Sequence, residues 1–139
     1  MNSAASVSAE LGLSLVVPGH GDIPLMASLY YSGGDPYAIR MAFHVGAEEP
    51  VEWIFSRDLL AAGLAAPAGE GDVRVWPEED HGLGVLNIAL SSPFGHAHFE
   101  APMIALADFL NKTFSLIAAG SESDFVDIDS ELDELLWRA

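Results

Sequence analysis

The sharpest chemical pattern in the chain is His96-Ala97-His98-Phe99-Glu100. Alternate residues of a β-strand point to one face about 7 Å apart, so two imidazoles and one carboxylate are expected to line up. Such groups are zinc ligands, and His81 or His44 could add one more. The alternative is an exposed polar face whose intervening residues pack in the core. We favour that alternative, because another strand would have to complete the metal site, and we expect no cofactor.

Two acidic clusters, Glu48-Glu49 with Glu52 and Glu78-Glu79-Asp80, could supply paired carboxylates for acid–base catalysis. That chemistry needs one carboxylate in an apolar pocket that raises its pKa. Both clusters border Pro or Gly in predicted turns, where solvation opposes such a shift. Phosphate-binding loops, nucleophile elbows and dinucleotide fingerprints are absent from the sequence. The sequence therefore predicts that the protein is not an enzyme.

Apolar segments separated by short turn clusters make the first hundred residues resemble a series of strands. The predicted strands are 7–17, 23–31, 37–45, 51–55, 73–76, 85–90 and 96–100. The turns between them are short enough for antiparallel neighbours to pair. A short helix over 57–62, capped by Ser56 and ended by Gly63, is expected to interrupt the strands.

A longer helix is predicted from Pro102, a residue suited to the first helical position, to Gly120. Its apolar stripe consists of Met103, Leu106, Leu110, Phe114 and Ile117. This spacing indicates an amphipathic helix that packs on a sheet. The fold class is therefore α+β, with antiparallel sheets, one short helix between strand sets and C-terminal helices on the sheets. Trp53 and Trp76 lie in predicted strands and are expected in the core.

Residues 121–139 form an acidic C-terminal tail of one predicted domain that spans 1–139. The tail holds seven acids and a single base, Arg138. Asp129 or Ser130 can cap a last helix there. This helix either docks on the body of the protein or contacts a partner, for which Trp is a frequent anchor. The candidate partner-binding residues are Leu132, Leu135, Leu136 and Trp137.

The net charge of −16 comes from 21 acids and only 5 Lys and Arg residues. Nucleic-acid affinity depends on cations that neutralise phosphates, and anionic membrane surfaces attract basic segments for the same reason. Both kinds of partner are therefore disfavoured, whereas a protein with a basic or apolar patch fits. The chain has no cysteine, signal peptide or membrane-spanning stretch, so we expect a cytoplasmic protein without membrane insertion.

Several long blocks of the sequence resemble the SsgA-like proteins, the actinomycete family that controls sporulation-specific cell division. The blocks are Phe43-His44-x-Gly46-Ala47-Glu48-Glu49-x-Val51-Glu52-Trp53, Arg57-Asp58-Leu59-Leu60 and Gly71-Asp72-Val73-Arg74-Val75-Trp76-Pro77. The similarity continues almost end to end, through Ile88-Ala89-Leu90-Ser91-Ser92-Pro93-x-Gly95 and the acidic tail. Ordered blocks of this length are far more specific than a short motif.

The resemblance implies a non-enzymatic regulator that recruits or positions the tubulin-like protein FtsZ at septum sites through protein–protein contacts. It also implies a fold like that of the Whirly single-strand nucleic-acid binders, assembled as a homotrimer. FtsZ is the expected partner, an SsgA-type protein is a second candidate, and the division septum is the expected location. The family supplies no cofactor and no catalytic residue.

The Whirly likeness implies an alternative function, a module that binds single-stranded nucleic acid. Such binding needs a positive groove with stacking aromatic side chains. Tyr30, Tyr31 and Tyr37 could stack on bases, but five scattered basic residues cannot form a positive groove. The charge therefore favours the protein adaptor.

Overall fold

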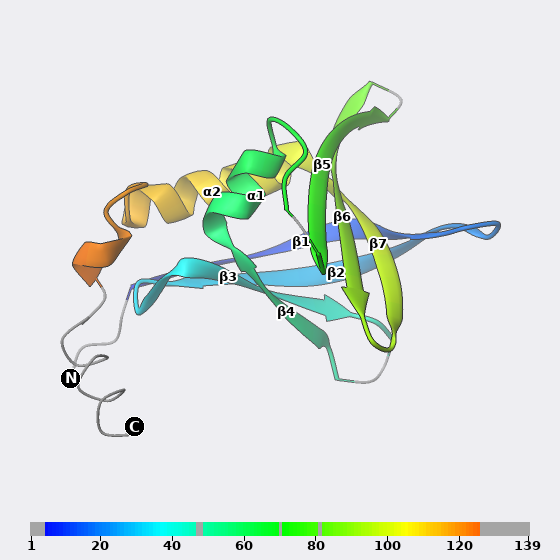
Figure 1. Ribbon diagram of the computed structural model, residues 1–139, viewed down its shortest axis with the longest axis horizontal. Helices are drawn as coiled ribbons and strands as arrows, with labels where there is room; N and C mark the ends of the chain where they lie inside the picture. The colour runs from blue at the N-terminus through cyan, green and yellow to red at the C-terminus, as the bar shows by residue number, and fades with distance from the viewer. Residues whose placement is uncertain (1–4, 47–48, 70, 81, 126–139) are drawn as a thin grey trace.

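The computed structural model describes residues 5–46, 49–69, 71–80 and 82–125, and its elements are shown in Figure 1. The strands are β1 (Ser6–Val17), β2 (Gly21–Ser32), β3 (Asp35–His44), β4 (Val51–Ser56), β5 (Val73–Asp80), β6 (Leu83–Ser92) and β7 (Gly95–Pro102). The helices are α1 (Arg57–Gly63), α2 (Met103–Leu116) and the 3₁₀ helix η1 (Glu122–Phe125). The described residues thus confirm the α+β class, and every predicted strand is present.

The strands form one seven-stranded sheet, in the order β4-β3-β2-β1-β7-β6-β5, rather than several sheets. All neighbouring strands are antiparallel. β1 pairs with β2 along its whole length, but with β7 only at Ser14–Glu100 and Leu15–Phe99. Because this junction is so short, β5, β6 and β7 stand steeply across the first four strands, and the sheet curls into a half-barrel (Figure 1).

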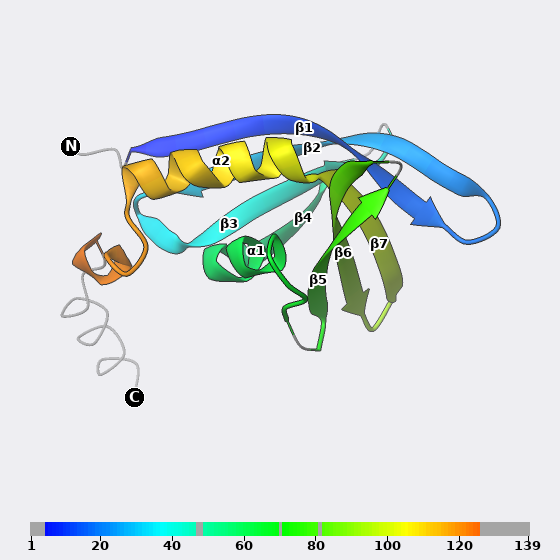
Figure 2. The same ribbon diagram turned by 90° about the horizontal axis from the view of Figure 1, so that it is seen from above.

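The hydrophobic core lies on the concave side of the curled sheet, beneath the two α-helices (Figure 2). Alternation along β1 puts Leu11 and Leu13 into this core, as a strand buried on one face requires. Phe43 of β3 and Phe99 of β7 stack there with ring centroids 4.3 Å apart. A fully buried side chain of this size stabilises the fold by about 1.5–3 kcal/mol, so the stack joins the two halves of the sheet.

Helix α2 is shorter than the sequence predicts, because it begins later and ends earlier. Pro102 is the last residue of β7 and the N-cap of α2, so the first helical residue is Met103. Ile117 leaves the helical region, with φ −138° and ψ 113°, and the helix therefore stops before Gly120. The buried face of α2 consists of Leu106, Phe109, Leu110 and Thr113. The predicted stripe is thus confirmed at its centre, whereas Met103 is only partly buried.

Helix α1 has the predicted cap, since the Ser56 hydroxyl accepts a hydrogen bond of 3.2 Å from the Leu59 N–H. Gly63 is its last helical residue rather than the residue after it. A Cβ atom at Gly63 would overlap the Val75 side chain, so this glycine allows α1 to lie directly on β5. No helix within the described ranges is long and apolar enough to cross a membrane.

The two tryptophans of the described residues are only partly buried, and for Trp76 the prediction of a core position was wrong. Trp53 packs at the margin of the core from edge strand β4. Trp76 lies on the outer face of β5, with its ring centroid 5.3 Å from that of His98. Strand alternation decides this, because the neighbours of Trp76 in β5, Val75 among them, occupy the core face.

Candidate interaction surfaces

The imidazoles of His96 and His98 lie on the outer face of β7, as the alternation predicts. Each is bonded to the neighbouring strand β6: His96 Nδ1 lies 2.9 Å from the Ser91 hydroxyl, and His98 Nε2 lies 2.7 Å from Asn87 Oδ1. Ala97, Phe99 and Ala101, which alternate with these polar residues along β7, turn to the core. These contacts are those of a polar strand face.

The structure does not bring these imidazoles together with further ligands among the residues that it describes. Those residues contain no group of three or more His, Cys, Asp or Glu able to hold a metal ion. His44 lies on β3, where its Nε2 is 2.8 Å from the Ser28 hydroxyl, and His81 is outside the described residues. The polar-face interpretation therefore fits this geometry better than a zinc site.

The acidic clusters lie at the surface rather than in an apolar pocket. Glu52 on β4 is exposed and lies 3.4 Å from the Arg40 guanidinium. Glu78 and Glu79 are exposed residues of β5, so the prediction of a turn there was wrong. The hairpin pairing of β5 with β6 continues through both positions, which extends the strand beyond Trp76. Glu48 is outside the described residues.

Arg57, the first residue of α1, is fully buried, which the sequence did not indicate. Its Nη1 atom donates hydrogen bonds to the carbonyl oxygens of Thr113 (3.1 Å) and Ile117 (2.8 Å) at the end of α2. Its Nη2 atom donates to Glu122 Oε2 at 2.8 Å. The guanidinium also lies 4.2 Å from the ring centroid of Phe114. One arginine thus joins α1, α2 and η1.

Two pKa values are shifted at this buried site. The hydrogen bond from the Arg57 side chain, followed by backbone hydrogen bonds, lowers the pKa of Glu122. Burial raises the pKa of the Tyr31 hydroxyl, and the nearby Arg57 charge partly opposes that rise. Because Glu122 Oε1 also accepts from the Gly120 N–H at 2.8 Å, the chain is fixed to the helices as far as Glu122. The candidate contacts Leu132, Leu135, Leu136 and Trp137 lie outside the described residues.

The three tyrosines considered for base stacking do not form one surface. Tyr31 faces the core, and its hydroxyl donates to the Pro36 carbonyl at 2.9 Å. Tyr30 lies on the opposite face of β2, where 45% of its surface is exposed, and Tyr37 is exposed on β3. With one ring buried and few cations on the chain, this geometry gives no support to nucleic-acid binding.

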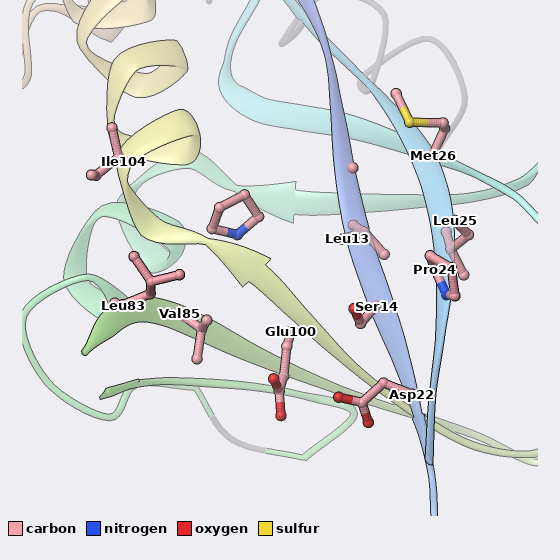
Figure 3. Close-up of a pocket in the computed structure, with 13 residues that line it drawn as sticks. Leu13, Ser14, Asp22, Pro24, Leu25, Met26, Leu83, Val85, Glu100 and Ile104 are labelled. Atoms are coloured by element: carbon pink, nitrogen blue, oxygen red, sulfur yellow. The ribbon is translucent and has the colours of Figure 1, made fainter. Parts of the chain in front are cut away.

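A groove of about 630 Å³ lies where the β1–β2 hairpin passes β6, β7 and the start of α2 (Figure 3). Its lining includes Met26, Leu83 and Ile104, whose surfaces are 47%, 68% and 84% exposed. The carboxylates of Asp22 and Glu100 lie near each other at one end of it (Figure 3). Sequence reasoning missed this groove because its walls come from segments far apart in the chain.

The family model described as "Streptomyces sporulation and cell division protein, SsgA" matches residues 25–122. The chain is 54% identical to the sporulation-specific cell division protein SsgB of Thermobifida fusca over 97% of its own length and 98% of that protein. It is 53% identical to SsgB of Streptomyces coelicolor, covering 94% of this chain and 96% of that one. These matches confirm the resemblance found in the sequence blocks.

Solved structures agree with the sequence matches. The crystal structure of an SsgA-like sporulation-specific cell division protein from Thermobifida fusca superposes with a TM-score of 0.87, at 54% identity over 96% of this chain and 98% of that one. A second structure is that of SsgB, whose mutations correlate to longitudinal cell division during sporulation of Streptomyces coelicolor. It also superposes with a TM-score of 0.87, at 51% identity over 90% of this chain and 98% of that one. The chain therefore belongs to the SsgA family of non-enzymatic sporulation and cell-division proteins of actinomycetes, and is similar to SsgB over nearly its whole length.

Proposed function

We propose that the protein recruits or positions FtsZ at septum sites through protein–protein contacts. The observation that carries this proposal is the similarity to SsgB, a sporulation-specific cell division protein, along nearly the whole chain. Such a role needs surfaces rather than bond-making chemistry. The strand-face imidazoles bonded to β6 and the solvent-exposed acidic clusters of the described residues are consistent with it.

The proposed adaptor acts in the cytoplasm at division septa, as a homotrimer with several equivalent binding surfaces. FtsZ polymers repeat the same surface many times, so a trimer can engage more than one subunit at once. Linked contacts convert the second binding event into an intramolecular one, and overall avidity can then exceed single-site affinity by about 10²–10⁴. An SsgA-type protein is a second proposed partner.

Co-sedimentation with FtsZ polymers tests the proposal directly. The full-length chain is mixed with polymerised FtsZ and, in parallel, with FtsZ kept unpolymerised, and both mixtures are centrifuged. We expect a saturable fraction of the protein to pellet only with polymer, and less of it when the protein is diluted below its trimer-forming concentration. A protein that stays in the supernatant at saturating polymer would refute the proposal.

A further inference from the structure

We propose that the free edge of β4 binds an extended segment of a partner protein, which adds to the sheet as a further strand. The inference deepens the proposed function, on which it rests, because it assigns the surface and the conformation of the partner segment. It differs from the sequence-based expectation, which placed the partner contacts in the C-terminal tail.

Strand β4 lies at one end of the strand order, at the margin of the sheet (Figure 1). In the part of the chain that the structure describes, it pairs with β3 alone. Alternate residues of an antiparallel strand direct their N–H and C=O groups to one neighbour, so the other main-chain groups of β4 point away from the sheet. Such a row of groups is a template for another strand. The edge itself therefore specifies an extended main chain as its ligand.

The side chains of β4 also suit an added strand. Its sequence, Val-Glu-Trp-Ile-Phe-Ser, consists mainly of the β-branched and aromatic residues that favour sheets. Val51 and Ile54 lie on opposite faces of the strand, and 48% and 64% of their surfaces are exposed. A neighbouring strand would cover both of them and the partly buried Trp53. A partner segment with β-branched residues at alternate positions therefore fits this margin of the core.

The strand at the other end of the sheet, β5, is closed to such an addition. Its Val75 exchanges two main-chain hydrogen bonds, of 2.8 and 2.9 Å, with Ala68. Two residues later, Pro77 has no N–H group to donate. Residues 51–56 of β4 include no proline or lysine, and their pairing with β3 runs without a bulge. The devices that block strand addition thus protect one edge of the sheet and not the other.

The same comparison argues against a second copy of the chain as the strand that covers β4. The β5 edge of a second copy is blocked by its own Ala68 and Pro77. A contact between two β4 edges is isologous and closes as a twofold dimer, whereas the proposed adaptor is a homotrimer. An extended segment of a different protein therefore fits the β4 edge better.

Binding of matched synthetic peptides tests the inference. The probes are a fluorescein-labelled peptide of alternating Thr and Val residues with a Lys at each end, and the same peptide with every amide N-methylated. Only the first can donate main-chain hydrogen bonds, so we expect it to bind at least about ten-fold tighter by fluorescence anisotropy. It should also slow hydrogen exchange at alternate amides of β4, those that do not face β3. Equal binding of the two peptides, or slowed exchange confined to other strands, would overturn the proposal.

Two edge variants and one matched control separate the edge from general charge effects. Lysine on an edge strand opposes pairing, so Ile54→Lys and Val51→Lys should each weaken peptide binding about ten-fold or more. Ile23→Lys makes the same change at an exposed position of β2 that pairs with Leu15, and it should leave binding within about two-fold. Circular dichroism checks that each variant is folded. Similar losses for the edge variants and Ile23→Lys would reject the β4 edge.

Two further measurements identify a wrong occupant. If Ile54→Lys or Val51→Lys changes the oligomer size in sedimentation velocity without any peptide, a second copy occupies the edge and the proposal fails. FtsZ co-sedimentation of the same variants separates this proposal from the proposed function. Co-sedimentation by the natural chain that both variants retain refutes the β4 edge alone. Peptide binding at β4 by a protein that ignores FtsZ polymers refutes the proposed function alone.

Discussion

The buried Arg57–Glu122 site and the Asp22–Glu100 groove place carboxylates beside apolar side chains in opposite ways. In the first, a cation of the same chain lies 2.8 Å from the carboxylate and both side chains are almost fully buried. In the second, the described lining residues include two carboxylates and no base, and the apolar side chains face solvent. The buried pair thus joins α1 to η1 within the chain, whereas the groove places two carboxylates and exposed apolar side chains at the surface.

Removing the buried cation should have the largest effect on stability. Arg57→Met leaves two carbonyl oxygens at the end of α2 and the Glu122 carboxylate without their donor. Breaking a buried ion pair at one partner costs about 3–5 kcal/mol, against a total stability of about 5–15 kcal/mol for a typical domain. Urea denaturation followed by circular dichroism measures the loss of unfolding free energy.

Arg40→Met is the matched control for that measurement. Arg40 pairs with Glu52 across β3 and β4, where both side chains are more than half exposed. Exposed pairs of this kind contribute about 0–1 kcal/mol, so Arg40→Met should leave the unfolding free energy nearly unchanged. Equal losses for the two variants would remove the distinction between the buried and the exposed ion pair.

The pH dependence of stability should show a smaller effect at the same site. The hydrogen bond from Arg57 lowers the pKa of Glu122 in the folded state. Stabilisation by this carboxylate is then fully present above the unfolded-state pKa of about 4.3 and is lost as the pH falls through the folded-state value. Glu122→Gln should therefore be less stable than the natural chain at pH 7 and approach it below pH of about 4.

Chemical denaturation between pH 7 and pH 3 measures this difference, with Glu52→Gln as the control at the exposed pair. The Glu52→Gln curve should run close to that of the natural chain throughout. If the Glu122→Gln curve keeps a constant offset down to pH 3, the carboxylate charge is not what stabilises the site.

The smallest effect is expected in the groove. Ile104 is 84% exposed in the first turn of α2, so Ile104→Ala should change the unfolding free energy by less than about 0.5 kcal/mol. Leu106, two residues later, is fully buried, and Leu106→Ala should cost about 2–5 kcal/mol. Thermal denaturation of both variants compares them. A large loss for Ile104→Ala would mean that the groove wall belongs to the core.

Local patterns were enough to predict the strands, because apolar runs between Pro- and Gly-rich turns carry that information themselves. The cap of α1 was predictable for the same reason, since Ser56 and Leu59 are close in sequence. The start of α2 was not predictable in this way. Pro102 is suited to a first helical position, but it instead completes the pairing of β7 with β6. Trp76 was misplaced because residue type says less than strand face, whereas Trp53 shares its strand face with the buried Phe55 and packs against the core.

Arg57 shows why part of the candidate site was beyond sequence reasoning. A cation at the first residue of a helix is unfavourable for that helix, whose N-terminus carries partial positive charge. The folded chain instead sets this guanidinium against the C-terminal carbonyls of α2, which carry partial negative charge. Its acceptors are more than 50 residues away in sequence, so no local pattern indicates the pairing.

The sequence by itself determined the α+β class, the family and a strongly acidic surface, because these follow from local periodicity, ordered blocks and counts of charge. Only the tertiary structure decided that two residue pairs between β1 and β7 join the strands into one curled sheet. It also decided that Glu122 receives a cation of its own chain, and that Asp22 and Glu100 line one groove with exposed apolar side chains. Alternation selects the face that a side chain occupies, but the curl of the sheet and its long-range contacts select its neighbours.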